Sequence, residues 1–559
     1  MTFFILYAFT SQAQETGKWG DQGNGLFRNP IIAGDYSDPD PIRVGTDYYM
    51  AASTFESYPG LTILHSKDLV NWEYSGSVFN NLADINKDFR WDKMNKYGDG
   101  IFAPSLRYHN GKFWVFVNFF GDGFFMATAD HPSKDWEIHQ IKDKNGKPLR
   151  TTNWTDPCPF WDDNGKAYLA SSRVGEQWFG YLFEMTPDGK QLLDADVAHM
   201  NLEDIKYNYP KGGTLFSPFQ STEGNKIYKR NGFYYLVHIE FLPDGQGCGT
   251  YFMRSKHIYG TKDDGTPGRP GDIGKYEIYK IGNDDCEGVN QEFPGQGGLV
   301  DTPDGRWFWI GQFNRINTDK YRVPHLVPVT WIHDWPVFGS NVKNGKGHML
   351  WEMEKPIKGF PIVYPYINDD FNEPTLNPIW QWNHVPNNKK WSLTEKEGYL
   401  RLHASKASTF YKAPNTLLQR HFKSDSTFTT IKIQFDGIVN GQKAGLAHFT
   451  GGENYAHLGV EKKGDNRFLF YEHDEQITEI KALKAHQNTL YLKTKLGMDN
   501  ITHWFYSFDG SNYIKIKNTY SIEAKGFRGD MVGVYSYNTK SDSGYIDLDW
   551  FIYEVNNKP

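Results

Sequence analysis

The sequence predicts an all-β protein, in which a five-bladed β-propeller is followed by a β-sandwich. Glycine numbers 55 and aromatic residues make up 16% of the 559-residue chain, a combination that suits many short strands joined by tight turns. Hairpin signals recur along the first part of the chain, and short alternating runs follow them. No segment shows a sustained helical periodicity.

Five segments share one outline, in which a strand-like run leads through a tight turn to a second such run. Asn231-Gly232 is the strongest of these hairpin signals, because a type I′ turn needs positive φ at both central residues. Successive turns lie 54 to 73 residues apart, enough for a four-stranded sheet with its loops. We therefore assign residues 25–340 to five propeller blades, with unrelated β-meanders as the alternative. The turn positions are Thr46, Asn110, Asn164, Asn231 and Asp304.

The remainder of the chain predicts a linker and a second domain. Residues 341–367 are punctuated by proline and glycine, as is typical of a linker laid along a surface. Alternating runs such as 428–435 and 490–494 then recur at the spacing of a β-sandwich. We place this domain at residues 368–559.

The N-terminus predicts a signal-peptide remnant over residues 1–14. An apolar stretch at 3–9 precedes a small-x-small motif at 11–13, although a basic region is missing. An intracellular protein with an apolar terminus is the alternative. No later apolar run reaches the roughly 18 residues of a membrane span. We therefore expect a secreted or periplasmic protein.

The charge distribution argues against a nucleic acid or an anionic membrane as partner. The formal net charge is −7, and no concentrated Lys/Arg block is present. Contacts to phosphate groups need dense positive charge. The sequence therefore favours a neutral ligand.

The repeat also predicts which side chains meet. In a propeller the innermost strand of each blade runs along the central axis, so residues at equivalent positions face one another at its mouth. Counting back eight residues from the turns selects one residue in each blade, and three of the five are carboxylic acids. Asp40, close to the first of them, is an alternative for the same role. The five residues are Asp38, Phe102, Asp156, Glu223 and Gln296.

Converging acids in different surroundings acquire different pKa values, which provides an acid and a base at one pH. Cleavage of a glycosidic bond needs this pair, with one carboxyl group protonating the leaving oxygen and one carboxylate activating water. Because the acids come from different blades, we expect the wider separation of an inverting enzyme.

The motifs around these acids resemble those of glycoside hydrolase family 43, the five-bladed family of β-xylosidases, α-L-arabinofuranosidases and arabinanases. The resemblance implies that Asp38, in Ser37-Asp38-Pro39-Asp40, is the general base. It likewise implies that Asp156, in Trp154-Thr155-Asp156-Pro157, modulates a pKa, and that Glu223, in Thr222-Glu223-Gly224, is the general acid. The segments 369–371, 380–382 and 391–393 are similar to the concanavalin-like C-terminal sandwich of the β-xylosidase branch.

Four further residues are expected to bind substrate. Phe55 resembles a family phenylalanine that offers a pentose an apolar platform, with blade core as the alternative. Arg322 matches the place of a substrate-contacting arginine, although an arginine packed between blades is the alternative. Phe102 and Gln296 occupy the repeat phase already described.

The chain departs from the family at three places near these acids. Phe102 replaces a frequent tryptophan, Gln296 replaces a histidine that often helps hold an axial calcium, and Asn225 replaces a proline. Because Gln296 is a poorer and neutral ligand, we assign no metal or other cofactor, while an axial calcium stays an alternative.

The sequence thus predicts an exo-acting, inverting glycoside hydrolase that releases a terminal pentose from plant hemicellulose or its oligosaccharides. α-L-Arabinofuranose is favoured slightly over β-D-xylose by the missing tryptophan and histidine. A non-catalytic, lectin-like carbohydrate-binding protein is the alternative, against which the presence of all three acids speaks.

Overall fold

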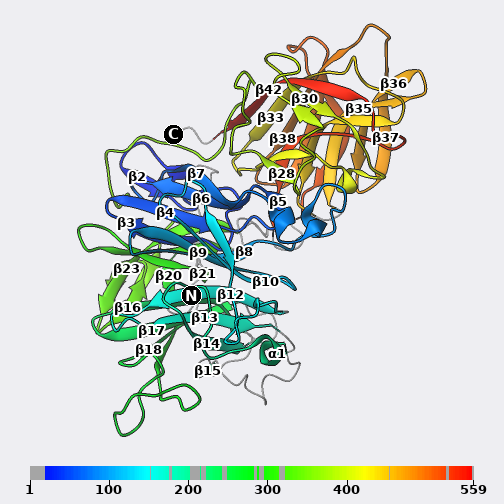
Figure 1. Ribbon diagram of the computed structural model, residues 1–559. Coiled ribbons are helices and arrows are strands. Elements are labelled where there is room, and N and C mark those ends of the chain that lie inside the picture. The colour runs from blue at the N-terminus through cyan, green and yellow to red at the C-terminus, as the bar shows by residue number, and fades with distance from the viewer. Residues whose placement is uncertain are drawn as a thin grey trace, which may run out of the picture.

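A computed structural model describes residues 19–556, apart from residue 152 and the segments 175–178, 202–213, 216–221, 242–247, 282–285, 289–294, 314–321, 452–453 and 524–527. The described chain forms a propeller and, packed against one side of it, a β-sandwich (Figure 1). The predicted all-β class is therefore confirmed. The predicted signal remnant at residues 1–14 lies outside the described residues.

The propeller consists of five four-stranded antiparallel sheets, each formed in chain order from its first strand outward. Blade 1 contains β3 (Asp40–Val44), β4 (Asp47–Ala52), β6 (Gly60–Ser66) and β7 (Trp72–Phe79). Blade 2 contains β8 (Phe102–His109), β9 (Lys112–Phe119), β10 (Gly123–Ala129) and β11 (Glu137–Gln140). Blade 3 contains β12 (Trp154–Trp161), β13 (Ala167–Arg173), β14 (Phe179–Met185) and β15 (Thr214–Leu215).

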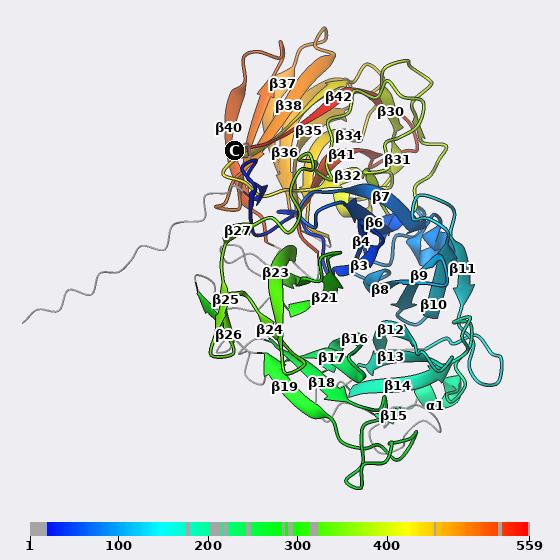
Figure 2. The same cartoon turned by 90° about the vertical axis from the view of Figure 1, so that its left-hand side faces the viewer.

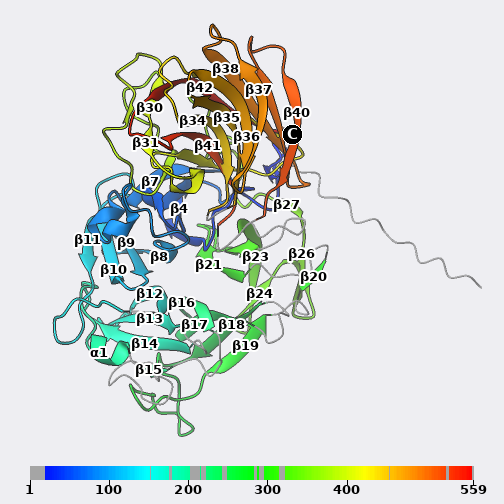
Figure 3. The same cartoon turned by 90° about the vertical axis from the view of Figure 1, so that its right-hand side faces the viewer.

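Blade 4 contains β16 (Thr222–Arg230), β17 (Phe233–Phe241), β18 (Cys248–Ser255) and β19 (Glu277–Ile281). Blade 5 contains β21 (Gly295–Asp301), β22 (Trp307–Phe313), β23 (Val323–Ile332) and β24 (Trp335–Phe338). The first strands of neighbouring blades contact one another, including β21 with β3, so the ring is closed. In Figures 2 and 3 the labels β8, β12, β16 and β21 accordingly surround the centre.

The predicted hairpin turns join the first two strands of every blade. Asn110 and Gly111 have φ of 50° and 76°, and Asn231 and Gly232 have φ of 49° and 75°. Both central residues are therefore left-handed, as a type I′ turn requires. The turns therefore lie at equivalent places in the five blades.

Helical structure in the described chain is limited to short turns in loops. They are η1 (Leu82–Asp84), η2 (Lys87–Phe89), α1 (Val197–Met200) and η5 (Phe410–Lys412). No helix among the described residues is both long and apolar enough to cross a membrane.

The segment expected to be a linker contains strands. Asn344 and Gly345, with φ of 53° and 76°, form the turn between β25 (Ser340–Lys343) and β26 (Lys346–Met349). β26 also pairs with β20 (Cys286–Gly288). β27 (Glu352–Glu354) pairs with β2 (Leu26–Arg28), which in turn pairs with β1 (Gly20–Asp21). Much of 341–354 therefore pairs with strands from the propeller part of the chain. The linker prediction missed these strands because the Asn-Gly hairpin lies inside a proline- and glycine-rich stretch.

The second domain is a sandwich of two sheets, whose strands pair antiparallel except for the parallel pairing of β31 with β41. One sheet has the order β37-β36-β35-β34-β41-β32-β28, with β31 beside β41, and the other has the order β29-β30-β42-β33-β38-β39-β40. β38 alternates half-buried and buried residues along its whole length, the pattern predicted for one face on a core. The strands of the first sheet are β28 (Gln381–Asn383), β31 (Ser405–Lys406), β32 (Leu417–Arg420), β34 (Gln442–Phe449), β35 (Tyr455–Lys463), β36 (Asn466–His473), β37 (Gln476–Leu483) and β41 (Met531–Asn538). Those of the second are β29 (Trp391–Ser392), β30 (Leu400–His403), β33 (Thr427–Gln434), β38 (Thr489–Leu496), β39 (Ile501–Ser507), β40 (Ile514–Ser521) and β42 (Tyr545–Val555).

The two domains share a sheet and a core. β5 (Ser57–Tyr58), from blade 1, pairs with β28 and so continues the first sandwich sheet into the propeller. A single apolar cluster includes Tyr36 and Trp72 of the propeller together with Phe422 and Trp380 of the sandwich. The sandwich therefore contacts blade 1 beside the segment that carries Asp38.

Candidate active site

The five residues selected by the repeat lie at one end of the innermost strands or just before it, where the backbone is irregular. Strands β8, β12, β16 and β21 each contain a register shift at this end. A bulge bends a strand and redirects its side chains. Asp38 and Asp156 have φ of 55° and 52°, which is uncommon for a residue other than glycine. In blade 4 the left-handed residue is Gly224 and not Glu223. The residue equivalent to Asp156 in that blade therefore lies one position later than the count of eight residues places it.

Asp38 is buried and its carboxylate is held by hydrogen-bond donors. Ser53 Oγ donates to Oδ2 at 2.5 Å, and the backbone N–H of Ala103 approaches the same oxygen at 3.4 Å. Arg322 Nη1 lies 3.2 Å from Oδ1. The backbone N–H of Asp38 donates to Gln312 Oε1 at 2.7 Å. These donors fix the position of the Asp38 carboxylate.

Asp156 connects blades 3, 4 and 5. Its Oδ2 accepts the backbone N–H of Gly224 at 2.5 Å and Gln296 Nε2 at 3.3 Å, while Thr155 Oγ1 donates to Oδ1. Burial raises the pKa of Asp156 to about 6, with the charge of Asp38 acting in the same direction and the hydrogen bonds from Thr155 and Gly224 opposing it. Through its hydrogen bond with the N–H of Gly224, Asp156 fixes the backbone next to Glu223.

Glu223 differs from Asp156 in how strongly its pKa is raised. Burial raises its pKa well above the ordinary range, and the negative charges of Asp156 and Asp38 raise it further, whereas Arg322 opposes the shift. Of the two neighbouring acids, Asp156 has its oxygens already bonded to donors that stabilise its charge. Of this pair, the pKa of Glu223 is the more strongly raised, as a general acid requires.

Asp40 has a different environment from Asp38, although only one residue separates them. It is fully buried, and its Oδ2 accepts Arg107 Nη1 at 2.7 Å and the backbone N–H of Leu106 at 2.8 Å. Lys226 Nζ lies 3.5 Å from Oδ1. Asp40 is thus committed to an ion pair between blades, and the alternative assignment of the base to Asp40 loses its support.

The aromatic residues form a stack beside Asp38. The rings of Phe55 and Phe102 are 6.5 Å apart and nearly parallel, and Phe120 lies 4.9 Å from Phe102. Phe55 is only 1% exposed, so its ring supports the half-buried Phe102 ring from behind. The sequence-based expectation that Phe55 itself offers an open platform is therefore not what this structure shows.

The structure also brings in residues that sequence reasoning did not assign. Ser53 and Gln312 bond directly to Asp38, and Asp35 accepts the backbone N–H of Arg322 at 3.0 Å. Ser53 lies two residues before Phe55, but nothing in its spacing indicates a contact with Asp38. Gln312, on β22, comes from outside the aligned strand set, so the repeat count could not select it.

The residues present do not suit an axial cation. Gln296 is neutral, and its amide nitrogen donates to Asp156. Lys226, 4% exposed, already places an ammonium group on the innermost strands. Within the described parts of the chain, no three His, Cys, Asp or Glu side chains are grouped as metal ligands.

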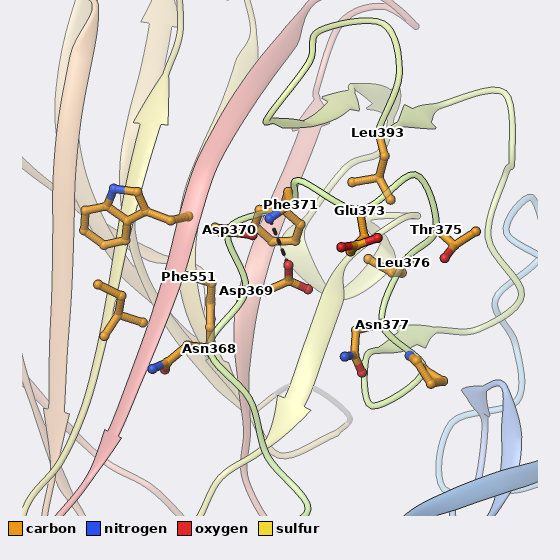
Figure 4. Close-up of a pocket in the computed structure, with 13 residues that line it drawn as sticks. Asn368, Asp369, Asp370, Phe371, Glu373, Thr375, Leu376, Asn377, Leu393 and Phe551 are labelled. Atoms are coloured by element: carbon orange, nitrogen blue, oxygen red, sulfur yellow. Dashed lines mark hydrogen bonds between the residues drawn. The ribbon is translucent and has the colours of Figure 1, made fainter.

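A separate hollow of about 640 Å³ lies on the sandwich and contains none of the predicted site residues. Figure 4 shows the loop 368–378 around it, with acidic side chains at Asp369, Asp370 and Glu373. Both oxygens of Asp369 are already bonded, one to the backbone N–H of Phe371 and the other to Trp380 Nε1. Because this hollow contains none of the acids Asp38, Asp156 and Glu223, we assign the chemistry to the propeller.

Comparison with known proteins identifies this arrangement. The family described as "Glycosyl hydrolases family 43" matches residues 27–336, more than half of the chain. The chain belongs to glycosyl hydrolase family 43. A second family, described as "Beta xylosidase C-terminal Concanavalin A-like domain", matches residues 368–554, which are the sandwich. The resemblance read from the motifs is confirmed.

Full-length relatives carry two activity names. A "Beta-xylosidase" of Formosa agariphila is 32% identical over 578 residues, covering 97% of this chain and 92% of that protein. A "Non-reducing end alpha-L-arabinofuranosidase" of Bacteroides ovatus is 28% identical, with 94% of each chain covered. The solved structure of a bifunctional GH43–CE protein of Bacteroides eggerthii has a TM-score of 0.78 and 27% identity. The alignment covers 97% of this chain, which spans only 64% of that longer protein.

These findings decide between the two classes considered from the sequence. The family-43 chain is an exo-acting glycoside hydrolase rather than a non-catalytic carbohydrate-binding protein.

Proposed function

We propose that this enzyme removes a terminal pentose from plant hemicellulose or its oligosaccharides, with inversion at the anomeric carbon. The observation that carries the proposal is the contrast between Glu223, whose pKa is raised by burial and by two neighbouring acids, and Asp38, whose carboxylate faces donors. One group is suited to give a proton and the other to take one.

In the proposed reaction, Glu223 transfers its proton to the glycosidic oxygen as the bond between that oxygen and the anomeric carbon breaks. Asp38 takes a proton from a water molecule whose oxygen bonds to the anomeric carbon on the opposite face. Asp38 then returns its proton to solvent and Glu223 is reprotonated. The net reaction consumes one water molecule and releases the pentose and the shortened glycan.

Asp156 is proposed to act through Glu223. Its hydrogen bond with the backbone N–H of Gly224 holds the backbone next to Glu223 in place, and its negative charge keeps the proton on Glu223. Phe102 and Arg322 are the side chains best placed to contact the sugar, with Phe55 and Gln296 supporting them. Aromatic faces favour the apolar side of a sugar ring.

The preferred sugar is proposed to be α-L-arabinofuranose, with β-D-xylose as the second candidate. The relatives carry both names. The chain has Phe102 and Gln296 at the places of a frequent tryptophan and histidine. A panel of aryl α-L-arabinofuranoside and aryl β-D-xyloside, followed by arabinoxylan, arabinan and xyloglucan oligosaccharides, distinguishes the two.

Glu223→Gln tests the role of the acid. Because loss of a general acid costs about 10²–10⁴-fold in rate, we expect that reduction in kcat on an oligosaccharide, and a smaller one on an activated aryl pentoside. Glu73→Gln, at an exposed glutamate of blade 1, is the matched control and should leave both rates unchanged. Oligosaccharide turnover by Glu223→Gln within about threefold of the unmodified enzyme would contradict the assignment.

NMR of the first product anomer tests the stereochemistry. Inversion is expected because the acid and the base come from different blades. A product that retains the configuration of the substrate would place the second carboxylate in the role of nucleophile.

We also propose that the protein is secreted or periplasmic, on the basis of the apolar N-terminal stretch and the small-x-small motif that follows it. N-terminal sequencing of the extracellular or periplasmic fraction tests this. A mature protein that starts near residue 14 is expected, and an intact N-terminus in the cytoplasmic fraction would contradict the proposal.

A further inference from the structure

The sandwich contributes hydrogen bonds to the segment that leads into Asp38. Arg420, the last residue of β32, donates from Nε to the carbonyl oxygen of Asp35 at 2.8 Å. Its guanidinium group also lies 4.2 Å above the ring of Tyr36. The backbone N–H of Gly529 donates to Asp35 Oδ2 at 2.7 Å. Two separate parts of the sandwich therefore converge on one buried aspartate of the propeller.

These contacts reach the proposed base through two short routes. In the first, Arg420 Nη2 donates to the carbonyl oxygen of Ser53 at 3.1 Å, and Ser53 Oγ donates to Asp38 Oδ2. In the second, Asp35 Oδ1 accepts the backbone N–H of Arg322, whose guanidinium group bonds to Asp38 Oδ1. Each oxygen of Asp38 thus contacts a group whose backbone is held, directly or through Asp35, by the sandwich.

The surroundings make this arrangement stiff. The backbone N–H of Lys423 donates to the carbonyl oxygen of Ala33 at 2.9 Å, and Gly34 pairs with Phe422 in an isolated β-bridge. A Cβ atom at Gly34 would meet the Phe422 ring at 3.1 Å, so the two backbones approach closely. Burial raises the pKa of Asp35, while the N–H groups of Gly529 and Arg322 and the nearby guanidinium groups counteract that shift.

We propose that Arg420 and Asp35 are positioning residues for the general base, so that the sandwich completes the active site. The inference rests on the proposed role of Asp38. Arg420 aligns Ser53, Asp35 aligns Arg322, and together they fix the carboxylate at the place from which it activates water. A misplacement of about 1 Å in such a group can cost about 10²-fold in rate.

A double-mutant cycle separates positioning from general support of the fold. Arg420→Met should lower kcat on an aryl pentoside by at least about tenfold, while pentose still binds at one molecule per chain by calorimetry. In the Asp38→Asn background the same substitution should change the residual kcat by less than about twofold, because the group it positions is gone. Arg420→Lys should restore part of the rate.

Arg401→Met is the matched control. Arg401 is also a half-buried sandwich arginine, and it bonds to Asp547 at 2.7 Å within its own domain. Its loss should leave kcat unchanged. Should Arg420→Met fail to fold, Asp35→Asn takes its place in the same cycle, since it keeps the shape of the side chain but presents an amide nitrogen to one of two N–H donors.

Each outcome decides a distinct point. An unchanged kcat in Arg420→Met, or an equal loss in the two backgrounds, would overturn the positioning role. Activity of Asp38→Asn within about threefold of the unmodified enzyme would instead overturn the proposed base itself.

Discussion

Two charged clusters on the innermost strands have opposite balances. Asp38, Asp156 and Glu223 are three acids near one guanidinium group, that of Arg322, which bonds to Asp38 and lowers the pKa of Glu223 through its charge. Asp40, the first residue of β3, faces two cations, Arg107 and Lys226. In the first cluster, burial raises the pKa of Glu223, and the charges of Asp156 and Asp38 raise it further. In the second, the paired charges connect blades 1, 2 and 4.

Asp38 and Asp40 are only two positions apart, yet one belongs to the proposed catalytic site and the other to a stabilising cluster of ion pairs. Buried acids that lack enough cations hold protons, which a hydrolase uses. A buried acid with its cations in place is costly to disturb, because removing one partner leaves the other charge unpaired.

The largest expected effect is on catalysis, in Asp38→Asn. The amide cannot take a proton from water, so kcat should fall by about 10²–10⁴-fold on both aryl and oligosaccharide substrates. Thermal unfolding followed by circular dichroism should show that the protein remains folded. Loss of activity that merely parallels loss of folded protein would contradict a catalytic role.

The next effect is on stability, in Asp40→Asn. Arg107 and Lys226 would be left without their buried carboxylate, and breaking a buried pair costs about 3–5 kcal/mol in the free energy of unfolding. Denaturant titration measures this. Arg43→Met, which breaks a more exposed pair with Asp301, is the control and should cost no more than about 1 kcal/mol. Equal losses would remove the distinction between the two sites.

A smaller effect, with the opposite sign, is expected for the stability of Glu223→Gln. In the folded protein the raised pKa keeps Glu223 protonated, whereas the unfolded chain loses that proton above its ordinary pKa near 4.5. Unfolding therefore releases a proton, and stability falls as the pH rises above that value. Glutamine removes this dependence, so the melting temperature of the variant should exceed that of the parent at pH 7–8, and the difference should vanish near pH 4. A lower melting temperature at pH 7–8 would contradict the raised pKa.

The smallest effect is expected from metal removal. We propose that the enzyme works without a divalent cation, because Gln296 is neutral and Lys226 supplies positive charge near the axis. Dialysis against EDTA should leave kcat/KM unchanged. A loss of activity that calcium restores would show that an axial ion is needed after all.

The sequence predicted the architecture because its signals are local. Asn-Gly turns determine hairpins, and hairpins recurring with alternating strands determine blades. The linker was the exception, since the Asn344-Gly345 hairpin was masked by surrounding prolines and glycines.

The site was predicted less completely, for physical reasons. The repeat selected Asp38, Asp156 and Glu223, but it could not show that bulges displace Glu223 by one position relative to the aspartates. Neither could it select Gln312 from a second strand or Arg420 from another domain. Contacts between residues far apart in the chain leave no pattern in a single sequence.

Asp156 is proposed to keep the proton on Glu223, and the pH profile of Asp156→Asn tests this role. Because the charge of Asp156 raises the pKa of Glu223, its removal should move the basic limb of kcat/KM to lower pH. The measurement is kcat/KM on an oligosaccharide from pH 4 to pH 9 for both proteins. A basic limb that stays in place or moves to higher pH in the variant would contradict the account.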